Sequence, residues 1–256
     1  MTQFSLKIVA LCSMLLDHLA KVVLSSGVLT DVLGYSTDLW LRAMMMAVGR
    51  LAFPIFAWFT AEGCKKTKHP RKYLLRMLMF AVLSEVPFQL CFYGAYSRGL
   101  SLACHNVIFT MLFAACAIFA SKWLAQKRVP YAAAVLIPSV LVLALCWWQY
   151  TDYNAWGAAL ILLLYYMPNE KGRLITMASW VTVFMLIWHG WSGQGFSWIS
   201  GNNYGLLLQW LVEMLVVPLL ATYNGEKGMD RPWGKWLFYV FYPAHLLILF
   251  LIRLWL

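Results

Sequence analysis

The chain has 256 residues, of which 62% are hydrophobic and 12% are charged, and its formal net charge is +10. Soluble globular domains are about 45–50% apolar and about 25% charged, so this composition excludes an ordinary water-soluble domain. The basic balance alone would suit nucleic-acid binding, but the placement of the cations, described below, assigns it to membrane topology. The six cysteines are scattered and form no CxxC pair, so we expect no metal and no haem.

Several apolar segments of about 18–22 residues predict helices that cross a membrane, because about 20 helical residues span the hydrocarbon core. Backbone groups in lipid must be satisfied within the segment, and the strands of a membrane barrel would alternate apolar and polar residues. We therefore predict an all-α fold, a polytopic transmembrane helical bundle with about nine spans, as a single domain over residues 1–256. The expected spans are 6–25, 39–62, 72–94, 105–121, 131–150, 155–168, 173–190, 204–222 and 236–254.

The distribution of basic residues predicts the orientation. Lysine and arginine fill the second, fourth, sixth and eighth connections, whereas the odd-numbered connections hold little charge. By the positive-inside rule, these basic connections and the N-terminus are cytoplasmic, and the C-terminus faces outward. The first span is expected to be retained rather than cleaved as a signal peptide, because Asp17 and His18 interrupt its apolar run.

Ionisable side chains inside the spans carry the functional signal. A charge near the bilayer centre costs at least about 2.5–3.5 kcal/mol, so it usually has a partner and a use. Five of the expected spans bring such groups to similar depth, which predicts a buried polar centre if these helices pack together. The groups are Asp17, His18, Arg50, Glu85, Glu213 and His245.

The first span contains the main candidate for a general base. Lys21 stands four residues after Asp17 and can neutralise it along the helix, while His18 projects toward a different neighbour. A buried neutral imidazole accepts a proton from an amine or a hydroxyl. The alternative is a structural histidine that donates to a carbonyl or a carboxylate. In the last span, Tyr242 and His245 share one face at i, i+3, where a packing role is the alternative for Tyr242.

Arg50 is expected to pair with Glu85 in the bundle interior, with binding of an anionic ligand group as the alternative. Pro54 removes the N–H that would bond the Arg50 carbonyl, which predicts a kink. His105 and Asn106 begin the fourth span, and the Asn106 amide is a candidate donor to a carbonyl or an oxyanion. An oxidising exterior would also permit a disulfide between Cys91 and Cys104, and free cysteines are the alternative.

Four short motifs in matching order resemble the TraX family of bacterial membrane proteins, and the resemblance covers essentially the whole chain. They are LLDH in the first span, GRLAFPIFA in the second, NVIFT in the fourth and FYPAHL in the last. The family's named member acetylates the N-terminal amine of an F-type pilin. The resemblance therefore implies an acetyl-CoA-dependent acetyltransferase, multi-pass in the bacterial cytoplasmic (inner) membrane. The residues that it implies are Asp17, His18, Arg50, Asn106 and His245.

On this expectation, an acetyl group moves from acetyl-CoA to an amine, such as a pilin-like N-terminus, or to a hydroxyl of an envelope-side acceptor. His18 acts as the base, Asn106 or Arg50 stabilises the oxyanion, and His245 is a second base or an acid that protonates the CoA thiolate. Asp17 is the remaining residue that we expect to be catalytic. The expected binding residues are Arg50, Glu85, His105, Tyr242, Lys65 and Lys66, although the two lysines also have a plain topological explanation. The expected partners are acetyl-CoA, the acceptor and membrane lipid, with no nucleic acid, and the oligomeric state stays open.

Two other functional classes stay open. A proton-coupled membrane transporter also carries paired intramembrane acids and bases, although no inverted repeat is evident in the sequence. A non-enzymatic scaffold for pilus or envelope assembly would need the same residues only for folding.

Overall fold

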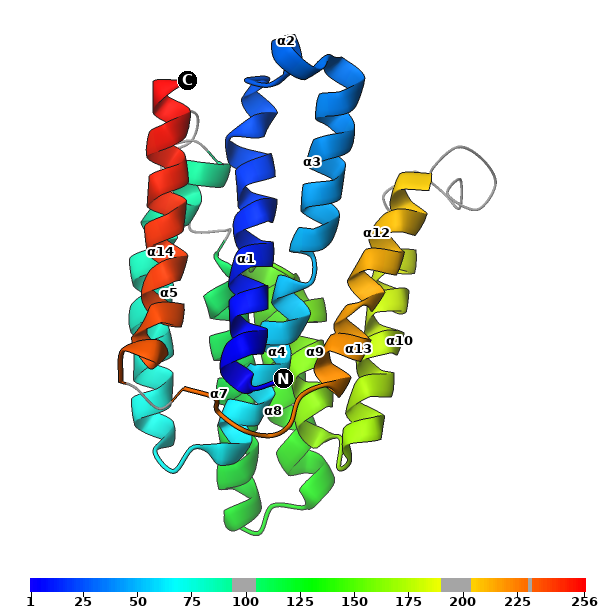
Figure 1. Cartoon of the computed structure of the whole chain (residues 1–256). Helices are drawn as coiled ribbons and strands as arrows, with labels where there is room; N and C mark the ends of the chain where they lie inside the picture. Colours follow the sequence, from blue (N-terminus) through cyan, green and yellow to red (C-terminus); the bar gives the residue numbers. More distant parts are fainter. Residues whose placement is uncertain (94–104, 190–203, 230–231) are drawn as a thin grey trace. The chain divides into compact units, whose positions relative to one another are not determined.

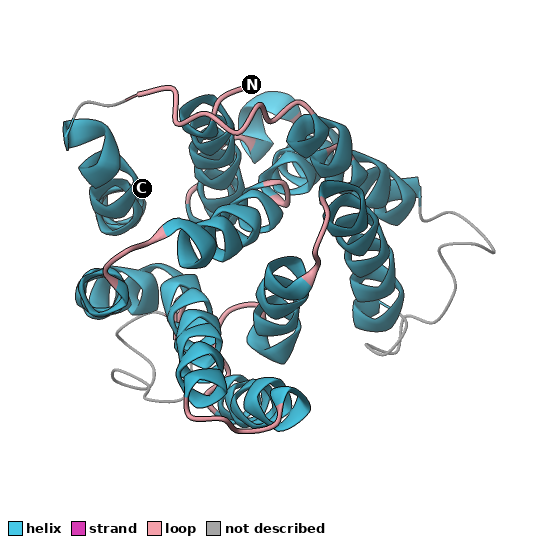
Figure 2. Cartoon of the chain, turned by 90° about the horizontal axis from the view of Figure 1, so that it is seen from below, coloured by secondary structure: helices cyan, strands magenta, loops and turns pink. Residues whose placement is uncertain are grey.

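The structure is a computed structural model that describes residues 1–93, 105–189, 204–229 and 232–256. Every regular element in these ranges is a helix, as Figure 2 shows, so the predicted all-α fold is confirmed. The contacts within the chain define two compact units. Unit 1 is Met1–Phe56 with Leu174–Leu256, and unit 2 is Ala57–Arg173. The expectation of a single domain stays a prediction.

The boundaries between the two units fall within two helices, α4 (Ala52–Lys66) and α10 (Glu170–His189), so each of these helices has residues in both units. The other elements of unit 1 are α1 (Gln3–Val22), η1 (Leu24–Ser26), α2 (Thr30–Leu33), α3 (Tyr35–Gly49), α12 (Tyr204–Met214), α13 (Val216–Ala221) and α14 (Pro232–Trp255). The other elements of unit 2 are α5 (Pro70–Phe92), α7 (Val107–Gln126), α8 (Tyr131–Trp148) and α9 (Asn154–Tyr166).

Six helical segments in the described ranges are long and apolar enough to cross a membrane. They are Gln3–Ser26, Tyr35–Lys66, Pro70–Phe92, Val107–Gln126, Tyr131–Trp148 and Trp236–Trp255. Two further expected spans are shorter apolar helices, Asn154–Tyr166 and Leu207–Ala221. The expected count of about nine spans is therefore too high for the described chain. Pro168 explains why one expected span is short. It follows directly after α9 and its C-cap Met167, and proline cannot continue a helix.

In unit 1, α1 contacts both α3 and α14, and Figure 1 shows it between them. Helix α3 also contacts α12. Apolar side chains on one face of α1 are buried, among them Leu6, Ala10 and Met14. The same helix carries Asp17, so its packing also takes a carboxylate out of contact with solvent or lipid.

Two of the helical segments in unit 1 are interrupted. Helix α3 ends at Gly49 and α4 begins at Ala52, and Figure 1 shows the break between them. Pro54 lies in the first turn of α4, where its missing N–H costs no helical hydrogen bond, so the expected kink is a full interruption. In the same way α12 ends at Met214 and α13 begins at Val216. The two interruptions place Arg50 and Glu213 at or beside helix ends.

Unit 2 is organised around α7, which contacts α5, α8 and α9. Small side chains let neighbouring helices approach closely, which is a main source of helix association in lipid. The small buried residues of α7 are Thr110, Ala114, Ala115, Ala117 and Ser121. Helix α8 instead exposes apolar side chains such as Leu141 and Trp148 along its length. Such an apolar face fits contact with lipid better than contact with water.

Candidate functional site

The polar end of α1 begins with an ion pair along the helix. The Lys21 Nζ lies 2.6 Å from the Asp17 Oδ2, which confirms that Lys21 neutralises Asp17. The Asp17 residue is only 8% exposed, and its Oδ1 has no hydrogen-bond partner within the described chain. The Nε2 of His18 lies 3.9 Å from the Asp17 Oδ2, which is too far for a hydrogen bond. Asp17 therefore contributes charge near His18 without a direct bond to it.

His18 bonds to a second histidine across two helices of unit 1. Its Nδ1 lies 2.7 Å from the Nε2 of His245 on α14, and the two rings are stacked with centroids 5.0 Å apart. His245 is 5% exposed. The contact between α1 and α14 thus brings together two of the sequence-predicted catalytic residues, 227 positions apart in the chain. The sequence predicted both residues but not this contact.

The hydrogen bonds define the tautomer of each ring. The His245 Nδ1 lies 2.8 Å from the Phe241 carbonyl oxygen, which can only accept, so Nδ1 carries the proton. The neutral His245 ring then has its lone pair at Nε2 and accepts the proton of the His18 Nδ1. A neutral His18 therefore has its basic lone pair at Nε2. A proton added there would give an imidazolium that is still bonded to His245, which is how a second group orients a histidine base.

Tyr242 lies beside His245, as their i, i+3 spacing predicted, and it also lies beside His18. Its ring centroid is 5.7 Å from that of His245 and 6.4 Å from that of His18, both with edge-to-face geometry. Tyr242 is 5% exposed. The Phe241 ring stacks on His245 with centroids 4.8 Å apart. Phe241 and Tyr242 therefore cover part of His245, and Tyr242 also contacts His18.

Helix α3 brings a cation to the same part of unit 1. Gly49 is buried directly against Asp17, and Arg50 is the next residue. Glu213 of α12 is 0% exposed, and neither of its carboxylate oxygens has a hydrogen-bond partner among the described residues. No ion pair within 4 Å joins Arg50 to Glu213 among the described residues. Arg50 and Glu85 belong to different units, so their expected pairing stays a prediction.

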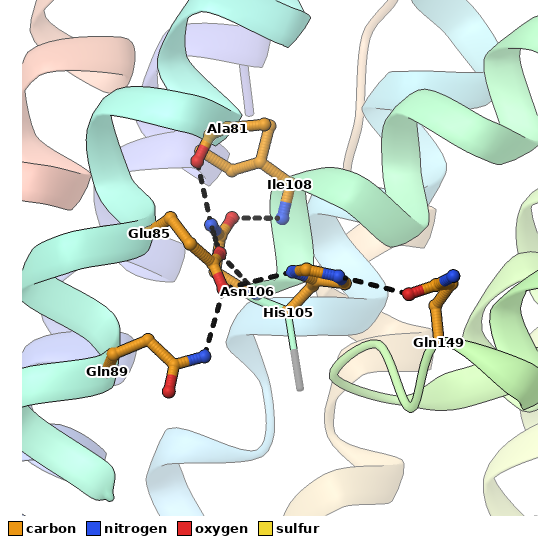
Figure 3. Close-up of polar contacts among 7 residues, drawn as sticks. All are labelled: Ala81, Glu85, Gln89, His105, Asn106, Ile108 and Gln149. Carbon is orange, nitrogen blue, oxygen red and sulfur yellow. Dashed lines mark hydrogen bonds and ion pairs between the residues drawn. The ribbon is translucent and has the colours of Figure 1, made fainter. Parts of the chain in front are cut away.

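Unit 2 holds a second polar group, which is centred on Glu85 of α5 (Figure 3). The Glu85 Oε1 accepts from the Gln89 Nε2 at 3.0 Å and lies 3.0 Å from the His105 Nδ1. The Glu85 Oε2 accepts from the Asn106 Nδ2 at 2.6 Å and from the Asn106 backbone N–H at 3.2 Å. The His105 Nε2 lies 3.3 Å from the Gln149 Oε1. This network links α5, the start of α7 and the end of α8.

Asn106 is 0% exposed, and its side chain is fully engaged. One N–H of its amide bonds the Ala81 carbonyl at 2.8 Å and the other bonds Glu85. Its Oδ1 accepts from the Ile108 N–H and so caps the first turn of α7. An amide has only two N–H donors, so none remains for an oxyanion in this arrangement. The geometry therefore gives Asn106 a structural role, and its expected oxyanion role stays a prediction.

The two lysines predicted to bind the donor differ in their surroundings. Lys66 pairs with Glu62 at 3.1 Å, and Arg173 pairs with the same carboxylate at 3.0 Å. The Arg173 guanidinium also lies over the Trp58 ring, 3.7 Å from its centroid. Lys65 donates to the Met167 carbonyl at 3.4 Å. Cys104 lies outside the described residues, so its expected disulfide with Cys91 stays open.

Sequence reasoning missed several partners of these sites. Gln89 and Gln149 were not predicted because an isolated glutamine in an apolar segment carries little signal. Gly49 was not predicted because a glycine at a helix contact looks like any other small residue. Gln89 stands four residues after Glu85, and helical spacing alone would have found that pair.

The fold and these polar groups define a helical membrane protein with a largely buried histidine pair. The model of the TraX family, described as TraX protein, matches residues 3–253, and the chain therefore belongs to the TraX family. The chain is also 29% identical, over 254 residues, to a probable fimbrial assembly protein, FimC of serogroup H1, from Dichelobacter nodosus. That alignment covers 96% of this chain and 93% of the relative. No solved structure matches the chain.

Proposed function

We propose that the protein is an acetyltransferase embedded in the bacterial inner membrane as a multi-pass protein, and that it acts in the assembly of pili or fimbriae. It would move an acetyl group from acetyl-CoA to the amine of a pilin-like N-terminus, or to a hydroxyl of another envelope-side acceptor. Membership of the TraX family and the assembly role named for the relative support this biological setting. The hydrogen bond between His18 and His245 is the observation that supports acetyl transfer as the reaction.

The proposed step uses His18 first as a base and then as an acid. The neutral acceptor amine attacks the thioester carbonyl carbon, and its N–H proton passes to the His18 Nε2. The C–N bond forms and the C–S bond breaks. The leaving thiolate takes the proton from His18, so that the products are the acetylated amine and the CoA thiol. Atoms and charge balance without a further reactant.

The neighbours of His18 support this cycle. His245 accepts from the His18 Nδ1 throughout, so the ring stays in one orientation when its charge changes. Asp17 and Lys21 form an ion pair beside His18, with the Asp17 Oδ2 3.9 Å from the His18 Nε2. Arg50, the residue after the glycine that touches Asp17, is the proposed group for the oxyanion. Tyr242 would shield the reacting atoms from water.

Two rival functions each have an observation in their favour. The relative is named for fimbrial assembly rather than for a reaction, which suits a non-enzymatic scaffold. Glu213, a buried carboxylate without a described hydrogen-bond partner, suits a proton-coupled transporter. A transporter would move substrate across liposomes without consuming acetyl-CoA. A scaffold would lose only folding when Asp17, His18 or Arg50 is replaced.

The test is CoA release from labelled acetyl-CoA by purified protein in nanodiscs, with membrane extract as the source of acceptor. The variants are His18→Ala and His245→Ala, and the matched control is His69→Ala, an exposed histidine before α5. Turnover that is lost in His18→Ala, with thermal unfolding unchanged, would support the acetyltransferase. Wild-type turnover in His18→Ala would refute the assignment of the base, and no turnover in any sample would refute the proposed chemistry.

A further inference from the structure

One end of unit 2 holds two lysines against a single tyrosine ring. The Lys65 Nζ lies 5.7 Å from the Tyr165 ring centroid, and the Lys122 Nζ lies 5.3 Å from the same centroid. Both distances fall within the range of cation–π contact. The three residues come from the ends of α4, α7 and α9, which are separate helices of the same unit. The fold therefore concentrates positive charge at this point.

Neither of these two lysines has an acidic partner within ion-pair distance in the described chain. Glu62, the nearby carboxylate, is bonded by Lys66 and Arg173 instead. Lys65 donates to the Met167 carbonyl at 3.4 Å, and Lys122 donates to the Cys64 carbonyl at 2.9 Å. An ammonium group has three N–H donors, so these single carbonyl contacts leave hydrogen-bonding capacity at both lysines.

The simplest explanation for the two lysines is capping of helix ends. Cys64 lies in the last turn of α4 and Met167 is the C-cap of α9, and cations are favourable at both places. Capping fixes the positions of the ammonium groups but does not remove their mutual repulsion. A bound anion would remove it. The two carbonyl groups would then hold both ammonium groups in position to bind that anion.

Access favours an anion that arrives from water. Lys65 is exposed and Lys122 is half-buried, and Tyr165 is half-buried beneath them. The basic residues Lys127 and Arg128 follow at the end of α7, and the positive-inside rule predicts a cytoplasmic location for this end. Lysine is a common ligand of phosphate groups, as a mobile point charge with several donors.

We infer that Lys65, Lys122 and Tyr165 form a phosphate-binding site that takes the phosphate groups of the CoA moiety of the acyl donor. This inference rests on the proposed function. Lys65 and Lys122 bind the anion, and Tyr165 positions them through its ring face. Lys66 is not assigned to this site, because it is already paired with Glu62. The phosphate of an anionic lipid headgroup offers the same chemistry, and the experiment separates the two sources.

The experiment measures binding of CoA, which has a free thiol, to purified protein in nanodiscs of phosphatidylcholine alone. The variants are Lys65→Gln, Lys122→Gln and Lys122→Arg. Lys127→Gln is the matched control, because it removes the same charge at the end of the same helix, beside Trp123 rather than Tyr165. Glutamine retains a donor for the capped carbonyl, so the folds should be preserved, and thermal unfolding checks this. A second set of nanodiscs contains phosphatidylglycerol.

We expect Lys65→Gln and Lys122→Gln each to weaken CoA binding at least about tenfold, because each variant removes a charge-assisted hydrogen bond to the phosphate. Lys122→Arg and Lys127→Gln should bind as the wild type does, and added salt should weaken binding to the wild type more than to the glutamine variants. If the glutamine variants bind CoA as tightly as the wild type, the inference is wrong while the proposed function stands.

The remaining outcome separates the two proposals. If the wild type binds no CoA in either kind of nanodisc, the proposed function fails. The phosphatidylglycerol retained by the protein then decides the inference. Retention that falls in Lys65→Gln and Lys122→Gln but not in Lys127→Gln would support a phosphate site whose ligand is a lipid headgroup. Equal retention in all variants would overturn the site altogether.

Discussion

Gly49 of α3 packs directly against Asp17 of α1. A Cβ added at position 49 would lie 2.9 Å from the Asp17 Cα and equally close to its Cγ. Part of that contact is backbone, which cannot rotate away as the end of a side chain can. The glycine therefore sets how closely α3 approaches α1, and with it the position of Arg50 relative to the polar end of α1.

Gly49→Ala should accordingly damage both folding and activity. The new methyl group must push α1 and α3 apart, and overpacking of this kind costs about 1–3 kcal/mol. Thermal unfolding and CoA release measure the two effects. Gly63→Ala is the matched control, because its methyl group would meet the end of the Tyr73 side chain, 2.9 Å from the hydroxyl oxygen, which can move. Equal stability of the two variants would contradict the close approach of α1 and α3.

The histidine pair predicts an ordered series of activities. Removing a general base typically costs about 10²–10⁴-fold in rate, so His18→Ala should lose turnover almost completely. His245→Gln retains an oxygen that can accept from the His18 Nδ1, whereas His245→Phe retains none. We therefore expect CoA release to fall from wild type to His245→Gln to His245→Phe. A His245→Phe enzyme as fast as the wild type would show that His245 does not orient His18.

Much of the unit 1 site follows from sequence because its signals are local. The pairing of Asp17 with Lys21 and the shared face of Tyr242 and His245 both come from helical spacing. The contact between His18 and His245 does not, because it depends on which two helices are neighbours. A sequence without aligned relatives contains no direct signal for such a pairing.

The helix boundaries were harder to predict for a physical reason. Hydropathy measures how apolar a segment is, and both sides of a break are equally apolar. Pro54 therefore suggested a kink, whereas the chain leaves the helix at Arg50 and Leu51. Asn106 shows a related limit. Its residue type suits an oxyanion donor, but the Ala81 carbonyl and the Glu85 carboxylate accept from both of its N–H groups in the folded protein.

Asn106→Ala should act mainly on stability. It removes the cap of α7 and two further hydrogen bonds in the interior, for a loss of about 3 kcal/mol in the free energy of unfolding. Thermal unfolding measures this loss, and Asn224→Ala, in an exposed loop of unit 1, is the control. If Asn106→Ala instead kept its stability and lost turnover, Asn106 would act on the reaction as an oxyanion donor.

Glu213 offers the sharpest distinction between an acyltransferase and a proton-coupled transporter. Its carboxylate is 0% exposed with no hydrogen-bond donor to either oxygen among the described residues, and an unsatisfied buried polar group costs about 1–3 kcal/mol. Glutamine has nearly the same shape without the charge. We therefore expect Glu213→Gln to unfold at the wild-type temperature or above it, with Glu226→Gln, at an exposed position, as the control.

The same variant should also keep its turnover of acetyl-CoA, because the proposed step passes the proton between His18, the acceptor and the thiolate. A transporter that carries its coupled proton on Glu213 would lose transport in Glu213→Gln, since an amide side chain does not take up and release a proton near neutral pH. CoA release and liposome flux are therefore measured on one preparation. Loss of CoA release in a stably folded Glu213→Gln protein would show that this carboxylate belongs to the reaction and that a cycle based on His18 alone is incomplete.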